Sequence, residues 1–299
     1  MLLVTGASGF LGGTLALEAL ASGRPVVGTA HSHNADQPGL QIVRVDLTAA
    51  SAVRELLGRM EPQWVVNCAA FTNVDECERD PVRARSLNVE LPRALAVACA
   101  RAGVGLVHIS TDSVFDGERG GYTEEDDPAP VNVYARSKLE GERAVQEAYP
   151  EALVLRTNFI GVSQSRTVGL ADWITFRLES GERIPGFTDV IFAPLLANEL
   201  SRLVLAAIDC GLKGLYHANA RDAWSKYDFA RRLAAALGFH AGLVDRASLA
   251  DAKLEARRPL NTSLSSSRLE AALGRPMPSV ESAIAGYVAL HAAAYASKP

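Results

Sequence analysis

The sequence has few of the residues that mark disulfide-rich or metal-binding proteins. Only four of its 299 residues are cysteines, and their positions follow no metal-ligand spacing: Cys68, Cys77, Cys99 and Cys210. A chain of this length buries enough apolar surface to fold without disulfides. We therefore expect reduced thiols, no metal site and a cytoplasmic location.

An excess of positive charge and long apolar runs are also absent. The chain has 30 Lys and Arg residues against 34 Asp and Glu residues, and its net charge of −4 suggests no surface for nucleic acid. No apolar run approaches the roughly 20 residues of a membrane-spanning helix, so no membrane association is expected. The first expected strand starts beside Met1, which leaves no room for a signal peptide. What remains is an ordinary globular composition, with 48% hydrophobic and 21% charged residues.

Three glycines follow the first expected strand directly. Leu2–Thr5 is apolar, and Gly6, Gly9 and Gly12 come next with the spacing G-x-x-G-x-x-G as a helical pattern begins. A strand that turns on glycines into a helix leaves unpaired N–H groups pointing at one spot, which attracts a phosphate. Gly6 permits the turn, Gly9 lets a pyrophosphate approach, and Gly12 lets helix and strand pack closely. The stretch predicts a dinucleotide site.

Apolar strands alternate with helices through the first half of the chain. Strands that are apolar throughout and alternate with helices indicate a parallel sheet covered on both faces. Right-handed crossovers then give an α/β fold with a doubly wound, Rossmann-type sheet. The expected strands are Leu2–Thr5, Pro25–Thr29, Ile42–Val45, Trp64–Asn67, Leu106–Ser110 and Ala152–Arg156, and the helices between them include Gly12–Ala21, Ala50–Met60, Val82–Ala102 and Tyr134–Ala148.

This alternation becomes irregular after about Ile160. We expect residues 1–160 to form the NAD(P)-binding domain and residues 161–299 to form mainly a smaller substrate-binding lobe, with some segments returning to the first domain. Short strands and loops are expected in Gly181–Pro194 and an extended segment in Arg257–Leu264. The other expected elements are helices at Leu170–Ser180, Leu195–Cys210, Ser225–Leu237 and from about Ser265, and a strand at Gly214–Ala218.

The ends of the second and third strands bear on the choice of cofactor. NAD-preferring folds usually carry an acidic residue after the second strand, and this chain has none there. A 2′-phosphate would meet no repulsion, and His31, Ser32 or His33 could contact it, so NADPH is favoured over NADH. Asp46 ends the third strand, where it could bind an adenine amino group or cap the next helix, although Thr48 fits the cap better.

Tyr134 and Lys138 form a Y-x-x-x-K pattern at the expected start of a helix. Residues four apart share a helix face, and an ammonium beside a phenol lowers the phenol pKa toward working pH. The tyrosine can then exchange a proton with a carbonyl or alcohol oxygen. Thr111 ends the strand Leu106–Ser110, so its hydroxyl could hold the same oxygen, with Ser110 as an alternative.

These motifs, in this order, resemble those of the extended short-chain dehydrogenases/reductases, and most closely the dTDP-4-dehydrorhamnose reductases. The matching stretches are VTGASGFLG, VDLT, VNCAAFTNVDECE, STDSVFDG, YARSKLEGE, LRTNF and RPLNTSLSSSRL. The resemblance implies a catalytic set of Thr111, Tyr134 and Lys138, and a substrate-binding set of Thr111, Asp112 and Phe159. It implies cofactor contacts from Gly6, Ser8, Gly9, Phe10, Leu11, Gly12, Asp46, Leu47, Ala69, Ala70, Phe71, Thr72, Tyr134 and Lys138.

The resemblance implies an NAD(P)H-dependent reductase of the 4-keto group of a nucleotide-activated deoxysugar. Its expected partners are that substrate and, in a homodimer, a second copy of the chain. The chain departs from the family at Ser113, where Tyr is frequent, at Phe159, where Trp is frequent, and in the segment GFTDVIFAPLLANEL, which bears on sugar or nucleotide recognition. One alternative is a sugar-nucleotide epimerase or dehydratase, although the Asp-Glu pair typical of dehydratases is missing after Thr111. The other is a non-catalytic subunit like the methionine adenosyltransferase β subunit.

Four further features have two readings each. His108 within a strand is expected to be a packed core residue rather than a base. Glu124–Asp127 is expected to be a solvated loop rather than a metal site. Arg257 and Arg258 could reach a diphosphate or form surface ion pairs. Asn88 could fix backbone near the cofactor or serve helix packing.

Overall fold

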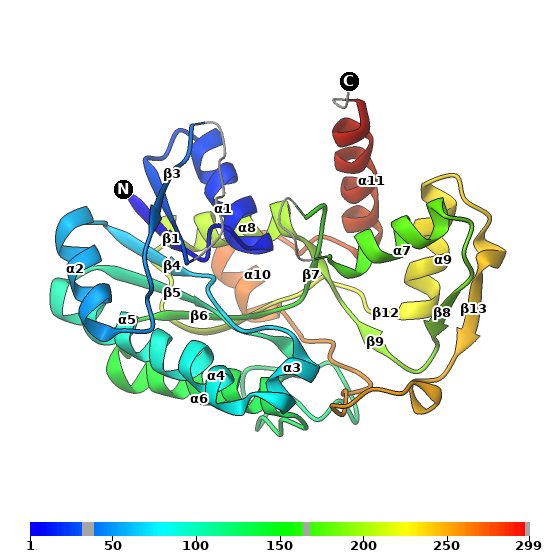
Figure 1. The fold of residues 1–299 in the computed structure, drawn as a ribbon, viewed down its shortest axis with the longest axis horizontal. Helices are drawn as coiled ribbons and strands as arrows, with labels where there is room; N and C mark the ends of the chain where they lie inside the picture. Colours follow the sequence, from blue (N-terminus) through cyan, green and yellow to red (C-terminus); the bar gives the residue numbers. More distant parts are fainter. Residues whose placement is uncertain (32–38, 164–167, 297–299) are drawn as a thin grey trace.

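A seven-stranded parallel sheet forms the centre of the protein (Figure 1). The computed structural model describes residues 1–31, 39–163 and 168–296. The strand order is β11-β6-β5-β4-β1-β2-β3, so the chain starts in the middle and winds outward to both edges. The strands are β1 (Leu2–Thr5), β2 (Val26–Ala30), β3 (Gln41–Arg44), β4 (Trp64–Asn67), β5 (Gly105–Ile109), β6 (Leu153–Thr157) and β11 (Gly214–Ala218). The predicted doubly wound α/β fold is confirmed.

Helices cover both faces of this sheet because neighbouring strand residues point to opposite sides. Val4 and Val66 pack with α1 and α8, whereas Leu3 and Val65 pack with α2, α5 and α6. These helices span Phe10–Ala21 (α1), Ala50–Met60 (α2), Leu91–Ala102 (α5), Val133–Ala148 (α6) and Ala197–Asp209 (α8).

The expected helix Val82–Ala102 is not continuous. The structure has α3 (Val74–Arg79), which was not expected, then α4 (Pro81–Arg85), a π-helical turn at Ser86–Glu90, and α5. Pro92 lies in the first turn of α5 and has no N–H to donate, which favours a change of hydrogen-bonding pattern just before it. Such π-helical turns are frequent at functional sites.

Two other boundaries differ from the sequence-based prediction. Leu195 does not begin a helix, because Leu195–Leu196 forms β10 and pairs with β7 (Phe159–Ile160). The N-cap of α2 is Ala49 rather than Thr48, because Thr48 donates to Asp46 instead. By contrast, Ser225 caps α9 as predicted, accepting a hydrogen bond from the Asp228 N–H.

The second half of the chain builds a smaller lobe beside the carboxyl ends of the strands, on the right in Figure 1. β8 pairs in parallel with β13, and β9 pairs antiparallel with β12. β11 and α8 return to the central sheet and its helical layer. None of the described helices combines the length and apolar character that crossing a membrane requires. The lobe elements are α7 (Leu170–Glu179), β8 (Ile184–Phe187), β9 (Ile191–Phe192), β12 (Trp224–Ser225), α9 (Lys226–Ala236), β13 (Val244–Ala247) and α11 (Val280–Ala296), whereas α10 (Ser267–Leu273) packs against β11 of the central sheet.

Candidate active site

The glycine loop between β1 and α1 has no room for side chains at two of its three glycines. Gly6 has a φ of +67°, and a Cβ placed there would lie 2.9 Å from the backbone N of Ala69. A Cβ on Gly12 would lie 2.3 Å from the carbonyl oxygen of Gly6, so α1 can pack on the loop only without it. The turn and close-packing roles predicted for Gly6 and Gly12 match this geometry.

The N-terminus of α1 is open to an anion. Gly9 is the N-cap, it provides no side-chain hydrogen bond, and the first turn carries no acidic residue. The first N–H groups of a helix have no partner within the helix, and they lie at the positive end of its dipole. A dinucleotide phosphate fits this backbone cradle, which is the property the G-x-x-G-x-x-G spacing predicts. When bound there, a nicotinamide dinucleotide supplies or accepts hydride.

The loop after β4 lies against the glycine loop and is held by Asn88. The Asn88 side chain accepts from the Phe71 N–H at 2.8 Å and donates to the Phe71 carbonyl at 2.9 Å and to Ser137 Oγ at 2.9 Å. Ser137 lies on α6, between Tyr134 and Lys138. Asn88 therefore links the loop of Ala69–Thr72 to α6, the helix that carries Tyr134 and Lys138. Of the two roles considered for Asn88, this contact fits that of fixing a loop backbone.

At the other end of the expected cofactor site, Asp46 closes a turn. Its Oδ1 accepts from the N–H of Thr48 at 2.9 Å and from its hydroxyl at 2.7 Å, and these bonds lower the Asp46 pKa. Oδ2 lies 3.7 Å from His31 Nε2. Asp46 is largely exposed, so its adenine role stays a prediction. Ser32 and His33 lie outside the described residues.

Thr111, Tyr134 and Lys138 come together at the carboxyl end of β5. Thr111 accepts from the Ser113 N–H at 3.2 Å and hydrogen-bonds to the Tyr134 phenol. Lys138 is 3% exposed, and its ammonium donates to the Ile109 carbonyl at 2.7 Å. The three side chains that the sequence singled out thus converge beside the loops described above.

The pKa values at this cluster differ from one sequence-based expectation. Desolvation raises the pKa of Tyr134 to about 12, and the hydrogen bond with Thr111 only partly offsets it. The expectation that Lys138 lowers this pKa is wrong for the protein without ligands, because Lys138 is not among the groups that act on the phenol. Burial lowers the pKa of Lys138 to about 8, against the opposing charge of Glu142. A neutral phenol is the form that can donate a proton.

Asp112 connects this cluster to the C-terminal lobe. It is 1% exposed, and burial raises its pKa even though several side chains donate to it. Asn158 Nδ2 donates to its Oδ2 at 2.8 Å, and Thr262 also hydrogen-bonds to it. Asn158 and Thr262 were not predicted as site residues, although Asn158 follows a strand end and both lie in stretches that match the family.

A buried ion pair lies behind the cluster. The side chain of Arg156 is 4% exposed and that of Glu142 is 2% exposed, and Arg156 Nη2 lies 2.8 Å from Glu142 Oε2. Ser110 also donates to Glu142. Ser110 is therefore engaged with the ion pair, which leaves Thr111 as the hydroxyl beside Tyr134.

Of the remaining residues singled out in the sequence, some lie together as expected for a binding site, and others are occupied in ion pairs or in the core. The rings of Phe10 and Phe159 meet edge to face with centroids 5.5 Å apart, which joins a predicted cofactor residue to a predicted substrate residue. Arg258 pairs with Asp75 at 3.0 Å, in line with the ion-pair reading. His108 is 1% exposed, so its reading as a core residue is confirmed.

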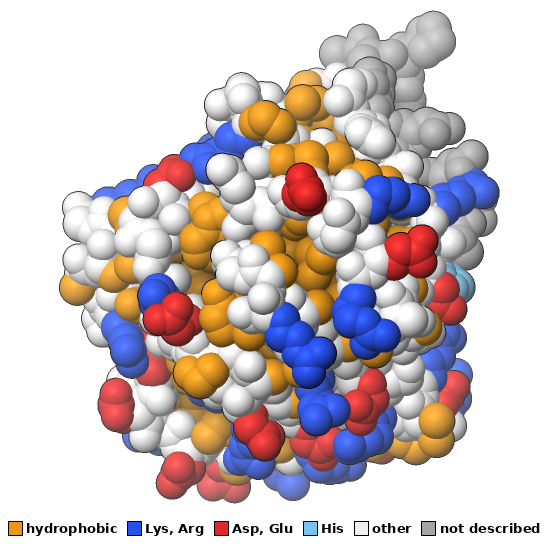
Figure 2. Space-filling model, turned by 90° about the vertical axis from the view of Figure 1, so that its left-hand side faces the viewer, with side chains coloured by type: hydrophobic (Ala, Val, Ile, Leu, Met, Phe, Trp, Pro, Cys, Tyr) orange, Lys and Arg blue, Asp and Glu red, His pale blue; other side chains and the backbone are white. Residues whose placement is uncertain are grey.

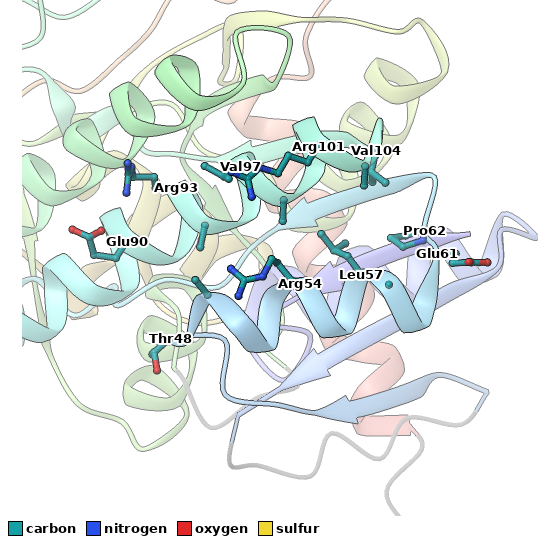
Figure 3. A pocket seen from close by; sticks show the side chains of 15 residues that line it. Thr48, Arg54, Leu57, Glu61, Pro62, Glu90, Arg93, Val97, Arg101 and Val104 are labelled. Atoms are coloured by element: carbon teal, nitrogen blue, oxygen red, sulfur yellow. The ribbon is translucent and has the colours of Figure 1, made fainter.

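A cavity of about 990 Å³ lies on the outer face of the molecule, between α2 and α5. Figure 2 shows this face, where an apolar strip runs between charged side chains. Arg54 on α2 and Arg93 and Arg101 on α5 line the cavity (Figure 3). It contains none of the predicted site residues, so the candidate active site is the cluster at the carboxyl edge of the sheet.

Comparison with known proteins places the chain in a family. The model of the RmlD substrate binding domain matches residues 1–292. A probable low-salt glycan biosynthesis reductase of Haloferax volcanii is 37% identical over 94% of this chain and 95% of its own length. The dTDP-4-dehydrorhamnose reductase of Mycobacterium tuberculosis is 36% identical over 77% of this chain and 73% of its own length. The crystal structure of the dTDP-4-dehydrorhamnose reductase of Bacillus anthracis in complex with NADP has a TM-score of 0.84 and 27% identity, covering 97% of this chain and 98% of that one. The resemblance found in the sequence motifs is confirmed, and the chain belongs to the RmlD substrate binding domain family.

Proposed function

We propose that this protein is an NAD(P)H-dependent reductase of the 4-keto group of a nucleotide-activated deoxysugar, similar to the dTDP-4-dehydrorhamnose reductases. The observation that carries this proposal is the convergence of Thr111, Tyr134 and Lys138 beside an uncapped helix N-terminus and its glycine loop. The two reductase relatives and the NADP-bound neighbour support it. NADPH is the proposed cofactor because the stretch Gly28–His33 at the end of β2 contains no acidic residue to repel a 2′-phosphate.

In this proposal Tyr134 is the general acid. As hydride reaches the keto carbon, the C=O double bond becomes a C–O single bond and its oxygen takes the phenolic proton. Thr111 holds that oxygen by a hydrogen bond, and the phenolate later recovers a proton from solvent. The raised pKa of Tyr134 keeps the phenol protonated near neutral pH until the reaction draws the proton away. Lys138, whose ammonium donates to the Ile109 carbonyl, would bond the nicotinamide ribose.

The proposed substrate contacts are Thr111, Asp112 and Phe159. Asn158 and Thr262 hydrogen-bond to Asp112, and these bonds fix its side chain between the catalytic cluster and the C-terminal lobe. The segment equivalent to the family's sugar-recognition region differs here, and for this reason we propose the substrate class rather than the dTDP-rhamnose precursor itself.

We also propose that the protein forms a homodimer, which light scattering can test, and that it is located in the cytoplasm. The cytoplasmic location is supported by the free state of all four cysteines.

Tyr134→Phe tests the function directly. This change removes the proton donor and keeps the ring, so turnover with a panel of 4-keto nucleotide sugars should fall by roughly two to four orders of magnitude. Oxidation of NADPH or NADH, followed by absorbance, measures it. Tyr149→Phe is the control, because Tyr149 is the C-cap of α6, at the opposite end of the helix from Tyr134 and the cluster.

The two alternatives predict different results in the same experiment. An epimerase or dehydratase would purify with tightly held NAD⁺ and would not consume NADPH. A non-catalytic subunit would oxidise no reduced cofactor with any keto-sugar of the panel. Full activity of the Tyr134→Phe variant would refute the assignment of the general acid.

A further inference from the structure

Lys226 is a cation in the C-terminal lobe that has no carboxylate partner in the part of the chain that the structure describes. It is the first residue of α9, and its backbone N–H donates to the Val190 carbonyl at 2.8 Å. Throughout residues 1–31, 39–163 and 168–296, no acidic oxygen lies within 4.0 Å of its ammonium. Lys213, which lies between α8 and β11 and carries the same charge, pairs with Glu151 at 2.8 Å and gives a comparison. Lys226 is therefore available for a negatively charged ligand.

The position of Lys226 follows from a short chain of contacts that ends at the catalytic cluster. Its ammonium lies 6.0 Å from the centre of the Phe192 ring on β9. The neighbouring Ile191 accepts a hydrogen bond from the Thr262 N–H at 3.1 Å, and the Thr262 side chain bonds to Asp112. Asp112 in turn accepts from Thr111 at 3.3 Å. Lys226 thus lies beside the lobe strand β9 that is linked, through Thr262, to the aspartate that the catalytic threonine contacts from the sheet.

The electrostatic setting of Lys226 favours an anion. Desolvation lowers its pKa, the negative charge of Asp112 opposes this, and Arg258 adds to it. Asp112 already receives hydrogen bonds from Thr111, Ser113, Asn158 and Thr262, so it does not need the lysine as a donor. A desolvated ammonium without its own counter-ion gains most from a ligand that supplies negative charge.

We propose that Lys226 binds a phosphate group of the nucleotide-sugar diphosphate and so holds the substrate from the side opposite Thr111 and Tyr134. The proposal rests on the proposed function for the nucleotide-sugar diphosphate, and the lysine supplies the positive charge that a phosphate group needs. A compact ammonium suits a phosphate oxygen as a point charge, without the two-pronged geometry of arginine. Arg258, which Asp75 and the Ala256 carbonyl already hold, contributes charge nearby rather than a free guanidinium.

The test is the affinity of the purified chain for thymidine 5′-diphosphate and uridine 5′-diphosphate, measured by calorimetry. Lys226→Met should weaken the binding of whichever diphosphate the protein takes by about 10- to 100-fold, the range expected for a lost hydrogen bond to a charged group. Lys226→Arg should keep most of the affinity. The matched control is Lys213→Met, which removes the same charge at the ion pair with Glu151 and should leave the affinity unchanged.

Two further measurements separate this proposal from a structural role and from the proposed function. NADPH affinity of Lys226→Met should equal that of the wild type and its melting temperature should be equal or higher, because the side chain of Lys226 makes no hydrogen bond among the described residues and its charge is desolvated. If the diphosphate affinity of Lys226→Met equals that of the Lys213→Met control, or if the wild type binds neither diphosphate, the proposal is overturned. If the diphosphate loss occurs but no keto-sugar is reduced, the reductase assignment fails while the phosphate-binding role of Lys226 stands.

Discussion

The buried pair of Glu142 and Arg156 gives a prediction whose size can be worked out from the structure. Three bonds join the two side chains, from Arg156 Nε at 3.1 Å to each carboxylate oxygen and from Nη2 at 2.8 Å to Oε2. Both side chains are at least 96% hidden from water, so neither charge can be solvated if the other is removed. Glu142→Gln keeps the shape, removes the negative charge and leaves the guanidinium buried without a counter-ion.

The expected cost of Glu142→Gln is about 3–5 kcal/mol of the free energy of unfolding, because breaking a buried pair strands a charge. That is a large share of the roughly 5–15 kcal/mol available to a folded domain. The double change Glu142→Leu with Arg156→Met removes both charges, and it should cost far less than the single change or nothing. Urea unfolding followed by the fluorescence of the three tryptophans measures each variant.

Glu140→Gln is the matched control, since Glu140 lies on the same helix. Its side chain is 49% exposed and pairs with the exposed Arg85 at 3.0 Å. Solvent screens that pair, so the control should unfold at the same urea concentration as the wild type. If Glu142→Gln also unfolds with the wild type, or if the double variant is less stable than the single one, the reasoning about the stranded charge is wrong.

Two shorter predictions concern the glycine loop and the pH dependence. Gly12→Ala places a Cβ 2.3 Å from the Gly6 carbonyl oxygen, so α1 must shift and NADPH affinity should drop at least about tenfold, as cofactor fluorescence would show. Gly58→Ala, in open space on α2, should stabilise the protein by about 0.5–1 kcal/mol and leave that affinity intact, and equal effects of the two changes would contradict the packing argument. The Lys138 pKa of about 8 lies below its ordinary value, so the ammonium is present below pH 8 and is lost above it. The value of kcat/KM for the free enzyme should therefore fall as pH rises through about 8; a flat profile from pH 7 to 9 would exclude a required Lys138 ammonium.

Strand positions were predictable because buried parallel strands are short apolar runs. Leu2–Thr5, Trp64–Asn67 and Gly214–Ala218 match the observed strands at both ends. Helix interruptions were less predictable: the apolar period through Val82–Ala102 does not show that a π-helical turn intervenes at Ser86–Glu90. That turn depends on backbone hydrogen bonding, and the side-chain period is insensitive to it.

The motif residues of the site were predictable for a different reason. Strand ends and helix starts bring Thr111, Tyr134 and Lys138 to one edge of a parallel sheet, and their spacing is local. Asn158 follows a strand of the same sheet, whereas Thr262 and Lys226 are brought near by the pairing of short segments in the C-terminal lobe, which no local sequence pattern indicates. The direction of the Tyr134 pKa shift was also out of reach, because desolvation depends on everything packed around the ring.

The return of β11 to the central sheet means that the two halves of this polypeptide cannot be treated as exchangeable modules. Its five residues hydrogen-bond along the whole of β6, and α8, which directly precedes it, covers the apolar face of α1. In a fragment ending near residue 160, β6 would have an edge without hydrogen-bond partners and α1 would have an exposed apolar face. Both features favour self-association. Grafting a new sugar specificity onto this scaffold is therefore better attempted by exchanging lobe segments that lie off the sheet, residues 186–196 among them, than by joining whole halves of two relatives.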